Sequence, residues 1–323
     1  MKLIDFGIYT LKSRKRDRDT EILSPRKYAD STTTYAGHEL LNSEEINHYL
    51  YNQIKRKEPF MACRWGGFEL ANVKKTDFPY CRPGNNNIND TFHFLCTNAG
   101  FFPEDIKLMP EFAKIMKDSC QEADFLAVWF RQFEDYYIKK YMKKKLKLGY
   151  LLDFEPWAAQ KCHWSAALEG MKVLVIHPFD ESIRMQYGRR ESIFPGTDIL
   201  PEFQLKTFKA IQTAGGCKDE RFGTWFDALQ YMYDEVMRID FDIAILGCGA
   251  YGMPLAAMIK KSGKMAIHLG GATQLLFGIK GHRWDKMDEF AYVRAYYNEN
   301  WVYPSMSETP EGAKKVEGAC YWQ

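Results

Sequence analysis

The sequence lacks the patterns that mark several specialised classes of protein. Its eight cysteines never fall into C-x-x-C spacing, which argues against a zinc site or a redox pair. We therefore expect buried free thiols in a reducing compartment and no disulfide framework. No uncharged apolar run approaches the roughly 18 residues of a membrane-spanning helix, and the first residues lack the apolar centre of a signal peptide. These absences predict a cytoplasmic protein.

An excess of charge of one sign is also absent. The chain has 44 basic and 42 acidic residues, a net charge of +2, and so gives no reason to expect a nucleic-acid partner. One run differs, because six lysines lie within the nine residues from Lys139 to Lys147. We interpret this run as a helix with a solvated surface. The alternative is peripheral contact with an anionic partner, such as the inner face of a membrane that carries a lipid-linked acceptor.

No repeat or low-complexity segment interrupts the chain, and no linker divides it. Residues 1–42 mix charges with a Ser/Thr cluster, so we expect an N-terminal arm or irregular cap there. A single domain is predicted over 43–305, beginning with a helix that Ser43 caps. Residues 306–323 form a polar and aromatic C-terminal tail. The sequence leaves open whether this tail packs on the domain or on a partner.

The second half of the chain alternates between predicted strands and helices. The segment 171–179 is a near-continuous apolar run of strand length, 203–213 alternates with a period of two, and 241–247 is a further strand. Helices are predicted over 224–239 and 253–263. Strands of unbroken apolar character are buried on both faces. The pattern is therefore typical of a Rossmann-like α/β fold, with a mainly parallel sheet and helices on both faces.

A G-x-G-x-x-G motif is formed by Gly247, Gly249 and Gly252, between a predicted strand and the helix that follows it. Glycines at such a turn let a ligand approach the backbone, and the start of the helix offers free N–H groups to an anion. Taken alone, the motif fits a dinucleotide, S-adenosylmethionine or a nucleotide-sugar. A tight turn without any ligand is the fourth alternative.

The turn after the next strand discriminates between these alternatives. A dinucleotide fold places an acid near the end of that strand, where it holds the ribose hydroxyls. Here the region contains His268, Gly270 and Gly271 and no carboxylate. We therefore expect no NAD. The missing acid also argues against S-adenosylmethionine, because enzymes that use it normally have an acid after this strand. Thr273 then caps or begins another helix, and two neighbouring glycine-rich turns predict a joint floor for a diphosphate.

Two other stretches supply candidate catalytic groups. In RWGGFE, Arg64 ends a strand and suits a phosphate or a carboxylate. Glu69 begins the next helix, either as a functional carboxylate or only as a partner of the helix dipole. In LLDFEPW, Asp153 and Glu155 lie two residues apart at the end of a predicted strand, so both carboxylates would point the same way. They could ligate Mn²⁺ or Mg²⁺, one could be a general base, or both could be solvated.

Three stretches together resemble the GT-D type of glycosyltransferase fold, a bacterial group often encoded with surface-polysaccharide enzymes. They are RWGGFEL, WSAALEGMKVLVIHPFDESIRMQY and DIAILGCGAYGMPLAAMIKKSGKMAIHLGGATQLLFG. The family pattern in the first stretch is similar to R-F-G-D-G-E. Arg64, Trp65, Gly66 and Glu69 match this pattern, whereas Gly67 stands where the family has an aspartate.

The resemblance implies transfer of a sugar from a nucleotide-sugar, usually UDP-linked, to a glycan acceptor. In that reaction Arg64 would offset the charge of the leaving diphosphate, and Glu69 or Glu155 would act as the base or as a metal ligand. Because Gly67 replaces the aspartate, either no cation is firmly bound, Asp153 and Glu155 supply the acids, or transfer is lost. The rival hypotheses are a catalytically silent nucleotide-sugar or glycan-binding partner and a GxGxxG oxidoreductase or methyltransferase.

Overall fold

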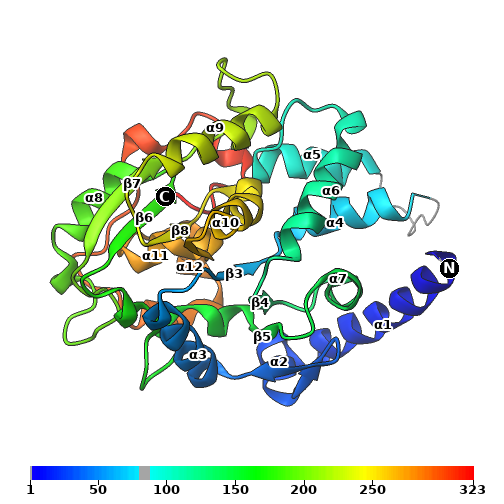
Figure 1. Ribbon diagram of the computed structural model, residues 1–323, viewed down its shortest axis with the longest axis horizontal. Helices are drawn as coiled ribbons and strands as arrows, with labels where there is room; N and C mark the ends of the chain where they lie inside the picture. Colours follow the sequence, from blue (N-terminus) through cyan, green and yellow to red (C-terminus); the bar gives the residue numbers. More distant parts are fainter. Residues whose placement is uncertain (1, 80–87) are drawn as a thin grey trace.

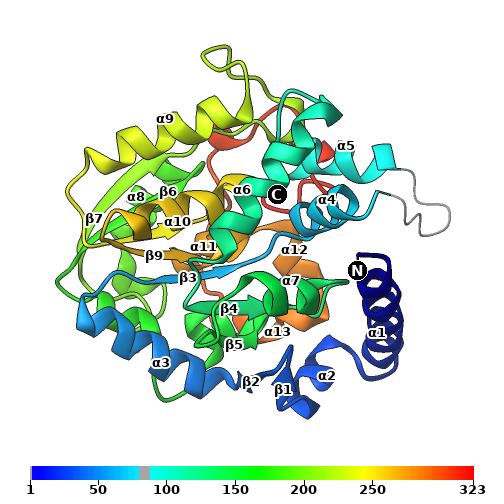
Figure 2. The same ribbon diagram turned by 45° about the vertical axis from the view of Figure 1, so that its right-hand side comes forward.

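One nine-stranded sheet forms the centre of the computed structural model, which describes residues 2–79 and 88–323 (Figures 1 and 2). Its strands are β1 (Thr34–Tyr35), β2 (His38–Leu41), β3 (Met61–Arg64), β4 (Phe125–Val128), β5 (Lys147–Tyr150), β6 (Lys172–His177), β7 (Gln204–Lys209), β8 (Ile243–Leu246) and β9 (Met265–His268). Their order is β1-β2-β5-β4-β3-β9-β8-β6-β7, and every neighbouring pair is parallel except β1 and β2. The predicted Rossmann-like α/β fold is confirmed.

Helices cover both faces of this sheet. In the described part of the chain they are α1 (Lys2–Leu23), α2 (Pro25–Ser31), α3 (Ser43–Arg56), α4 (Gly67–Asp77), α5 (Ile88–Ala99), α6 (Met109–Cys120), α7 (Glu134–Tyr141), α8 (Asp180–Tyr187), α9 (Trp225–Met237), α10 (Gly252–Lys261), α11 (Thr273–Leu276), α12 (His282–Lys286) and α13 (Ala291–Arg294). Helix α10 packs between α6 and α9 over one face, and α3 lies across the sheet from them (Figure 2).

The N-terminal segment is regular, although an irregular cap was one expectation for it. It contains α1 and α2, and β2 extends the sheet by pairing with β5. The sequence predicted that Ser43 caps the helix that follows. The capping residue is instead Asn42. The Asn42 side chain accepts a hydrogen bond from the Glu45 N–H at 3.0 Å, and the Glu45 carboxylate accepts one from the Asn42 N–H at 2.9 Å. This reciprocal capping box satisfies two backbone donors and fixes the start of α3.

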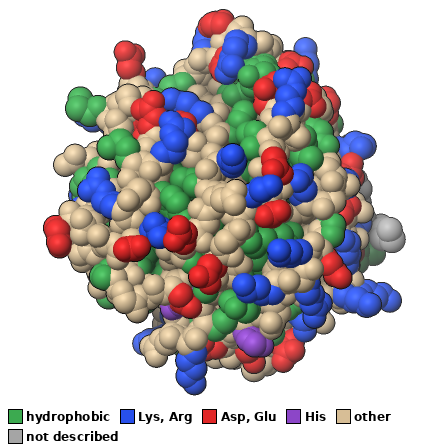
Figure 3. Space-filling model, turned by 60° about the vertical axis from the view of Figure 1, so that its left-hand side comes forward, with side chains coloured by type: hydrophobic (Ala, Val, Ile, Leu, Met, Phe, Trp, Pro, Cys, Tyr) green, Lys and Arg blue, Asp and Glu red, His purple; other side chains and the backbone are tan. Residues whose placement is uncertain are grey.

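The lysine-rich run is not one helix, so that prediction was wrong. Helix α7 ends at Tyr141, the backbone becomes extended at Met142, and Lys147 already belongs to β5. Leu146, between the lysines, is buried. Charge is otherwise well mixed, since basic and acidic side chains intermingle on the face shown in Figure 3.

Helix α1 is fixed to the loop that follows β4. The rings of Phe6 and Phe133 lie 5.4 Å apart between centroids. Arg16, which is buried, donates from Nε to the Phe130 carbonyl at 2.9 Å and from Nη2 to the Arg131 carbonyl at 3.0 Å. The N-terminal helix therefore holds the backbone of a loop that is more than a hundred residues distant in sequence.

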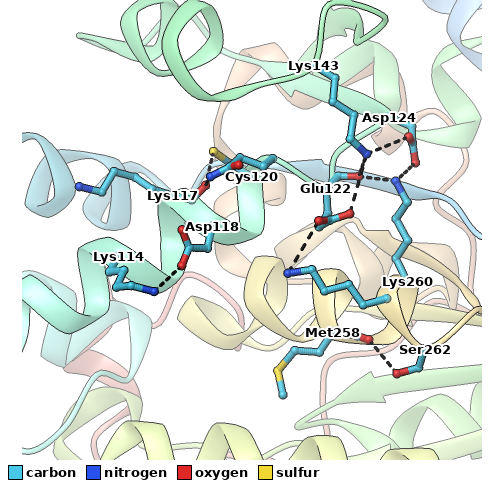
Figure 4. Close-up of polar contacts among 12 residues, drawn as sticks. Lys114, Lys117, Asp118, Cys120, Glu122, Asp124, Lys143, Met258, Lys260 and Ser262 are labelled. Atoms are coloured by element: carbon cyan, nitrogen blue, oxygen red, sulfur yellow. Dashed lines mark hydrogen bonds and ion pairs between the residues drawn. The ribbon is translucent and has the colours of Figure 1, made fainter.

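A charged network lies at the amino ends of β3 and β4 (Figure 4). Asp124 accepts hydrogen bonds from the Met61 N–H at 2.9 Å and from Lys260 Nζ at 2.6 Å. Lys143 Nζ lies 3.8 Å from carboxylate oxygens of both Glu122 and Asp124. Burial lowers the pKa of Lys260, and the hydrogen bond to Asp124 opposes that shift. The network ties α10 to the amino ends of β3 and β4, opposite the carboxyl ends of the strands.

The described cysteines confirm the predicted thiol state. Each of the seven is free, and the buried ones are Cys63, Cys96, Cys120, Cys248 and Cys320. Cys81 lies outside the described residues. Within residues 2–79 and 88–323, none of the helices is long and apolar enough to cross a membrane.

Candidate functional site

A cleft with a volume of about 1210 Å³ opens at the carboxyl ends of the parallel strands. Six neighbouring strands contribute the turns that line it. They contribute Arg64 (β3), Trp129 and Arg131 (after β4), Glu155 (after β5), His177 (β6), Gly247 and Gly249 (after β8), and His268, Gly270 and Gly271 (β9 and its turn). Ligands of open α/β sheets bind at this edge. The cleft is therefore the candidate functional site.

Most residues predicted from the sequence meet in this cleft. Those in its lining are Arg64, Glu69, Glu155, Gly247, Gly249, His268, Gly270 and Gly271. Gly252, Thr273 and Asp153 do not line it. Thr273 is buried behind the floor, where its hydroxyl donates to the Leu246 carbonyl at 3.2 Å.

Two glycines of the G-x-G-x-x-G motif make room for protein side chains. A Cβ atom on Gly247 would lie 2.5 Å from Cδ2 of His177, and one on Gly252 would lie 2.1 Å from Cε1 of His268. The imidazole rings therefore press directly on the backbone of this turn. Gly249 has a φ of +57° and lines the cleft, so its left-handed backbone favours glycine. Close packing thus explains two of the three motif positions without a ligand.

The second glycine-rich turn receives two further side chains. A Cβ atom on Gly270 would lie 2.8 Å from Nη1 of Arg64, and one on Gly271 would lie 2.5 Å from Cε1 of Tyr321. The guanidinium of Arg64 and the ring of Tyr321 thus rest on the backbone that follows β9. This contact places a cation on the predicted diphosphate floor.

Arg64 is a half-buried cation that interacts with the charge of Glu69 from beyond ion-pair distance. Its guanidinium lies 4.7 Å from the centroid of the Trp129 ring, and that of Arg131 lies 4.1 Å from the same centroid. Among the described residues Arg64 has no ion pair, and its buried Nε has no hydrogen-bond partner. The buried Trp129 Nε1 and His268 Nδ1 also lack partners. Polar atoms that are removed from water normally have partners, so the floor of the cleft, with its cation and these unpartnered atoms, suits an anionic ligand.

The two strand-end histidines bring no charge of their own. Burial lowers the pKa of His177 to about 3, and burial together with Arg64 lowers the pKa of His268 to about 3. His177 Nδ1 accepts a hydrogen bond from the Phe179 N–H at 3.0 Å. At neutral pH both rings are uncharged, so His268 can form a hydrogen bond to a ligand but no ion pair.

Glu69 is a buried carboxylate in the first turn of α4. Its side chain folds back over the glycine before the helix, since a Cβ atom on Gly66 would lie 1.8 Å from Oε2 of Glu69. Burial raises the pKa of Glu69, and the charge of Arg64 opposes that shift. The next glycine, Gly67, faces Trp129, whose Cη2 would lie 3.4 Å from a Cβ atom there. The residue at the family's aspartate position therefore borders the same cleft.

Asp153 and Glu155 do not point the same way from an extended chain. Residues Leu151–Phe154 form a 3₁₀ turn, so the expected strand ends earlier. Asp153 Oδ1 accepts from Arg26 Nη1 at 2.5 Å, whereas Glu155 accepts from the Tyr292 hydroxyl. In the described part of the chain no three His, Cys, Asp or Glu side chains form a group that could hold a metal ion. The two carboxyl groups thus do not fit a shared Mn²⁺ or Mg²⁺ site here.

Glu155 is expected to make the stability of the protein depend on pH. Burial raises its pKa from 4.5 to about 8, so the unfolded chain releases this proton at lower pH than the folded protein. The contribution of Glu155 to the free energy of unfolding therefore falls as pH rises from about 4.5 to about 8. Glu155→Gln removes this pH-dependent contribution. The free energy of unfolding of the variant should therefore exceed that of the unaltered protein by an amount that grows to on the order of 4 kcal/mol at pH 8.

Urea denaturation at several pH values measures this difference. Glu169→Gln, at an exposed position, is the control and should show no such trend. An advantage of Glu155→Gln that stays constant between pH 5 and pH 8, within about 1 kcal/mol, would contradict the prediction.

Sequence reasoning missed Trp129 and Arg131 as site residues. The apolar run FLAVWF, residues 125–130, is typical of a buried strand, but β4 ends at Val128 and the tryptophan begins the loop beyond it. An aromatic residue followed by an arginine at the carboxyl end of a strand was the available signal. The sequence leaves open where the C-terminal tail packs. It packs on the domain, because the buried ring of Trp322 lies 5.8 Å from that of Phe179 and the Tyr321 carbonyl accepts a hydrogen bond from Gln274 Nε2 at 3.1 Å.

Comparisons with known proteins leave the family open. No family model matches the chain, and no curated protein matches it. One solved structure, described as the "Selenomethionine substituted structure of domain of unknown function 1792 (DUF1792)", is similar with 13% sequence identity and a TM-score of 0.33. The match covers 81% of this chain and 96% of that one. A likeness at this TM-score carries no functional argument, so the evidence for function lies in the cleft.

Proposed function

We propose that the protein is a glycosyltransferase that moves a sugar from a nucleotide-sugar, most simply a UDP-linked one, to a glycan acceptor such as a surface-polysaccharide precursor in the cytoplasm. The observation that carries this proposal is the half-buried side chain of Arg64, which lies on the floor of a large cleft, has no ion pair among the described residues and has a buried Nε without a hydrogen-bond partner. A diphosphate supplies the anions that this cation lacks. The resemblance of the glycine-rich turns and of RWGGFEL points to the same class of substrate.

In the proposed reaction the acceptor oxygen forms a bond to the anomeric carbon of the sugar. The bond between that carbon and the diphosphate oxygen breaks, and the departing oxygen keeps the electron pair. Arg64 offsets the charge that develops on the leaving diphosphate. Glu69 takes the proton of the acceptor hydroxyl, because burial raises its pKa and makes its carboxylate a stronger base than an exposed one.

Glu155 has a different role in this proposal. With a pKa raised to about 8 by burial, its carboxyl is mostly protonated at neutral pH. It therefore donates a hydrogen bond to a sugar or acceptor hydroxyl and does not serve as the base. Because Asp153 and Glu155 have separate partners, no step is assigned to a metal. The prediction of Mn²⁺ or Mg²⁺ dependence is tested by adding each cation with the donor.

Thermal unfolding in the presence of nucleotides tests the proposal. UDP or a UDP-sugar at about a hundred times its Kd should stabilise the protein by about 2.7 kcal/mol, which corresponds to a rise in Tm of roughly 4 °C for a chain of this size. NAD and S-adenosylmethionine should produce no rise. If no nucleotide raises the Tm, the proposal fails, and a rise with NAD or S-adenosylmethionine alone would favour the oxidoreductase or methyltransferase instead.

Turnover separates the transferase from a silent binding partner. A glycosyltransferase should release UDP from a UDP-sugar when a glycan acceptor is present. Binding without release from any donor in a panel of UDP-hexoses, with and without Mn²⁺, would favour the non-catalytic nucleotide-sugar-binding partner. Glu69→Gln is the matched variant, because it should retain binding and lose turnover.

A further inference from the structure

The outward face of α1 is apolar where a surface helix is normally polar. Leu3, Ile4, Ile8 and Leu11 are exposed to 70%, 68%, 45% and 68%. Ile4, Ile8 and Leu11 follow the spacing i, i+4, i+7 and so form one stripe along the helix. The opposite face of α1 is seated on the domain by Phe6 and its neighbours. The stripe is therefore held outward by a fixed helix at the periphery of the molecule (Figures 1 and 2).

Basic side chains adjoin this stripe. Those at exposed positions in the following turns of α1 are Lys12, Arg14, Lys15 and Arg18. Residues 2–18 contain six basic residues and two acids, Asp5 and Asp17. Helix α7 adds a further cation, because Lys140 Nζ lies 2.5 Å from the Tyr136 hydroxyl, and the Tyr136 ring lies 5.1 Å from that of Tyr9 in α1. An apolar stripe with neighbouring cations is typical of a helix that lies in a membrane interface.

A small pocket on the same helix suits an anionic headgroup. Its volume is about 240 Å³. The charged side chains in its lining are Lys12, Lys15, Arg16, Asp19 and Asp135. Arg16 pairs with Asp135 at 3.5 Å, whereas Lys12 and Lys15 form no ion pair among the described residues. Tyr35, which is only 6% exposed, lines this pocket, and its buried hydroxyl has no hydrogen-bond partner. The pocket thus holds two lysines without an ion pair among the described residues, together with the carboxylate of Asp19.

We propose that the outward face of α1 docks on an anionic lipid membrane. Leu3, Ile4, Ile8 and Leu11 enter the boundary between headgroups and acyl chains, and Lys12 and Lys15 bind phosphate groups beside Tyr35. A second copy of the chain fits this face less well, because two such basic surfaces would repel each other. Four apolar side chains also cover less area than a stable dimer needs. This docking surface is independent of the proposed glycosyl transfer.

Sedimentation with vesicles tests the docking surface. The full chain should pellet with vesicles of equal parts phosphatidylcholine and phosphatidylglycerol, and much less with phosphatidylcholine alone. Leu11→Asp should lower the partition coefficient about tenfold or more, because it removes one inserted side chain. Lys12→Ala and Lys15→Ala should each lower it about fivefold, and added salt should weaken binding. Met306→Asp, at a methionine that is 92% exposed, is the matched control and should bind normally.

Three results would overturn the proposal. They are equal binding to both kinds of vesicle, unchanged binding by Leu11→Asp, or an equal loss in the Met306→Asp control. Sedimentation equilibrium without lipid provides the second measurement. A dimer that Leu11→Asp converts to a monomer would show that this face joins two copies of the chain instead. Because the substituted side chains are exposed, the variants should keep the Tm of the unaltered protein. If the Tm of Leu11→Asp is lower, the two lysine variants test the proposal instead.

Discussion

Arg64→Met is expected to bind UDP about a hundredfold more weakly than the unaltered protein, since a charged hydrogen-bonding group contributes about 1.5–3 kcal/mol and a diphosphate would engage it through more than one oxygen. The same substitution should leave the Tm of the ligand-free protein unchanged or slightly higher. The reason is that Arg64 is half-buried without an ion pair among the described residues, and burial lowers its pKa, so removing this charge relieves an electrostatic cost. Isothermal titration calorimetry and thermal unfolding measure the two effects.

Two variants make the Arg64 result specific. Arg64→Lys keeps the positive charge but loses the planar group that stacks on Trp129, so binding should be intermediate. Arg131→Met removes the exposed partner of the same ring, and its effect on the Kd for UDP should stay below about fivefold. Undiminished UDP binding by Arg64→Met would place the anion elsewhere. A large loss of Tm would instead give Arg64 a structural role.

Gly252→Ala is expected to destabilise the protein by about 1–3 kcal/mol. In a helix this change ordinarily favours the folded state by about 0.5–1 kcal/mol, because alanine loses less backbone freedom on folding. At Gly252, however, the added methyl group would lie 2.1 Å from the buried ring of His268. The ring would have to shift within a closely packed turn. Urea denaturation measures the loss in the free energy of unfolding.

A double-mutant cycle tests whether the His268 ring is the cause. His268→Ala removes the ring, so the added methyl group should cost little in that background, and the coupling should be about 1 kcal/mol or more. Gly7→Ala is the control, because a Cβ atom at Gly7 in α1 would meet nothing within 4 Å. It should stabilise the protein by about 0.5–1 kcal/mol. Additive effects of the Gly252 and His268 changes would contradict the proposed contact.

The central strands could be predicted because they are buried on both faces. β6, β8 and β9 each read as an unbroken apolar run beside turn residues. Strands β1 and β2 lie at one end of the sheet, are short, and have mixed burial, so no periodic pattern predicted them. Helix α1 escaped prediction for a related reason. Its apolar residues are divided between a face that packs and a face that is exposed, which erases the usual amphipathic pattern.

The positions of the site residues could be predicted better than their contacts. A glycine-rich turn after a strand indicates the carboxyl edge of the sheet, which is where Gly249 and Gly270 lie. That His268 fills the space beside Gly252 depends on the packing of β9 against α10. The partners of Asp153 and Glu155 come from distant segments of the sequence. Arg26, which binds Asp153, lies near the N-terminus, and Tyr292, which binds Glu155, lies near the C-terminus. No local pattern encodes such contacts.

The position of β9 has a consequence for how the chain folds. This strand pairs with β3 on one side and with β8 on the other, so it joins the strands of the first half of the chain to those of the second. During synthesis, the group β5-β4-β3 can assemble early, but the sheet is closed only when residues 265–268 have left the ribosome. The floor of the cleft, which follows β9 directly, is thus completed last. Long-range closure of this kind is slow, and until it occurs the edges of β3 and β8 stay unpaired.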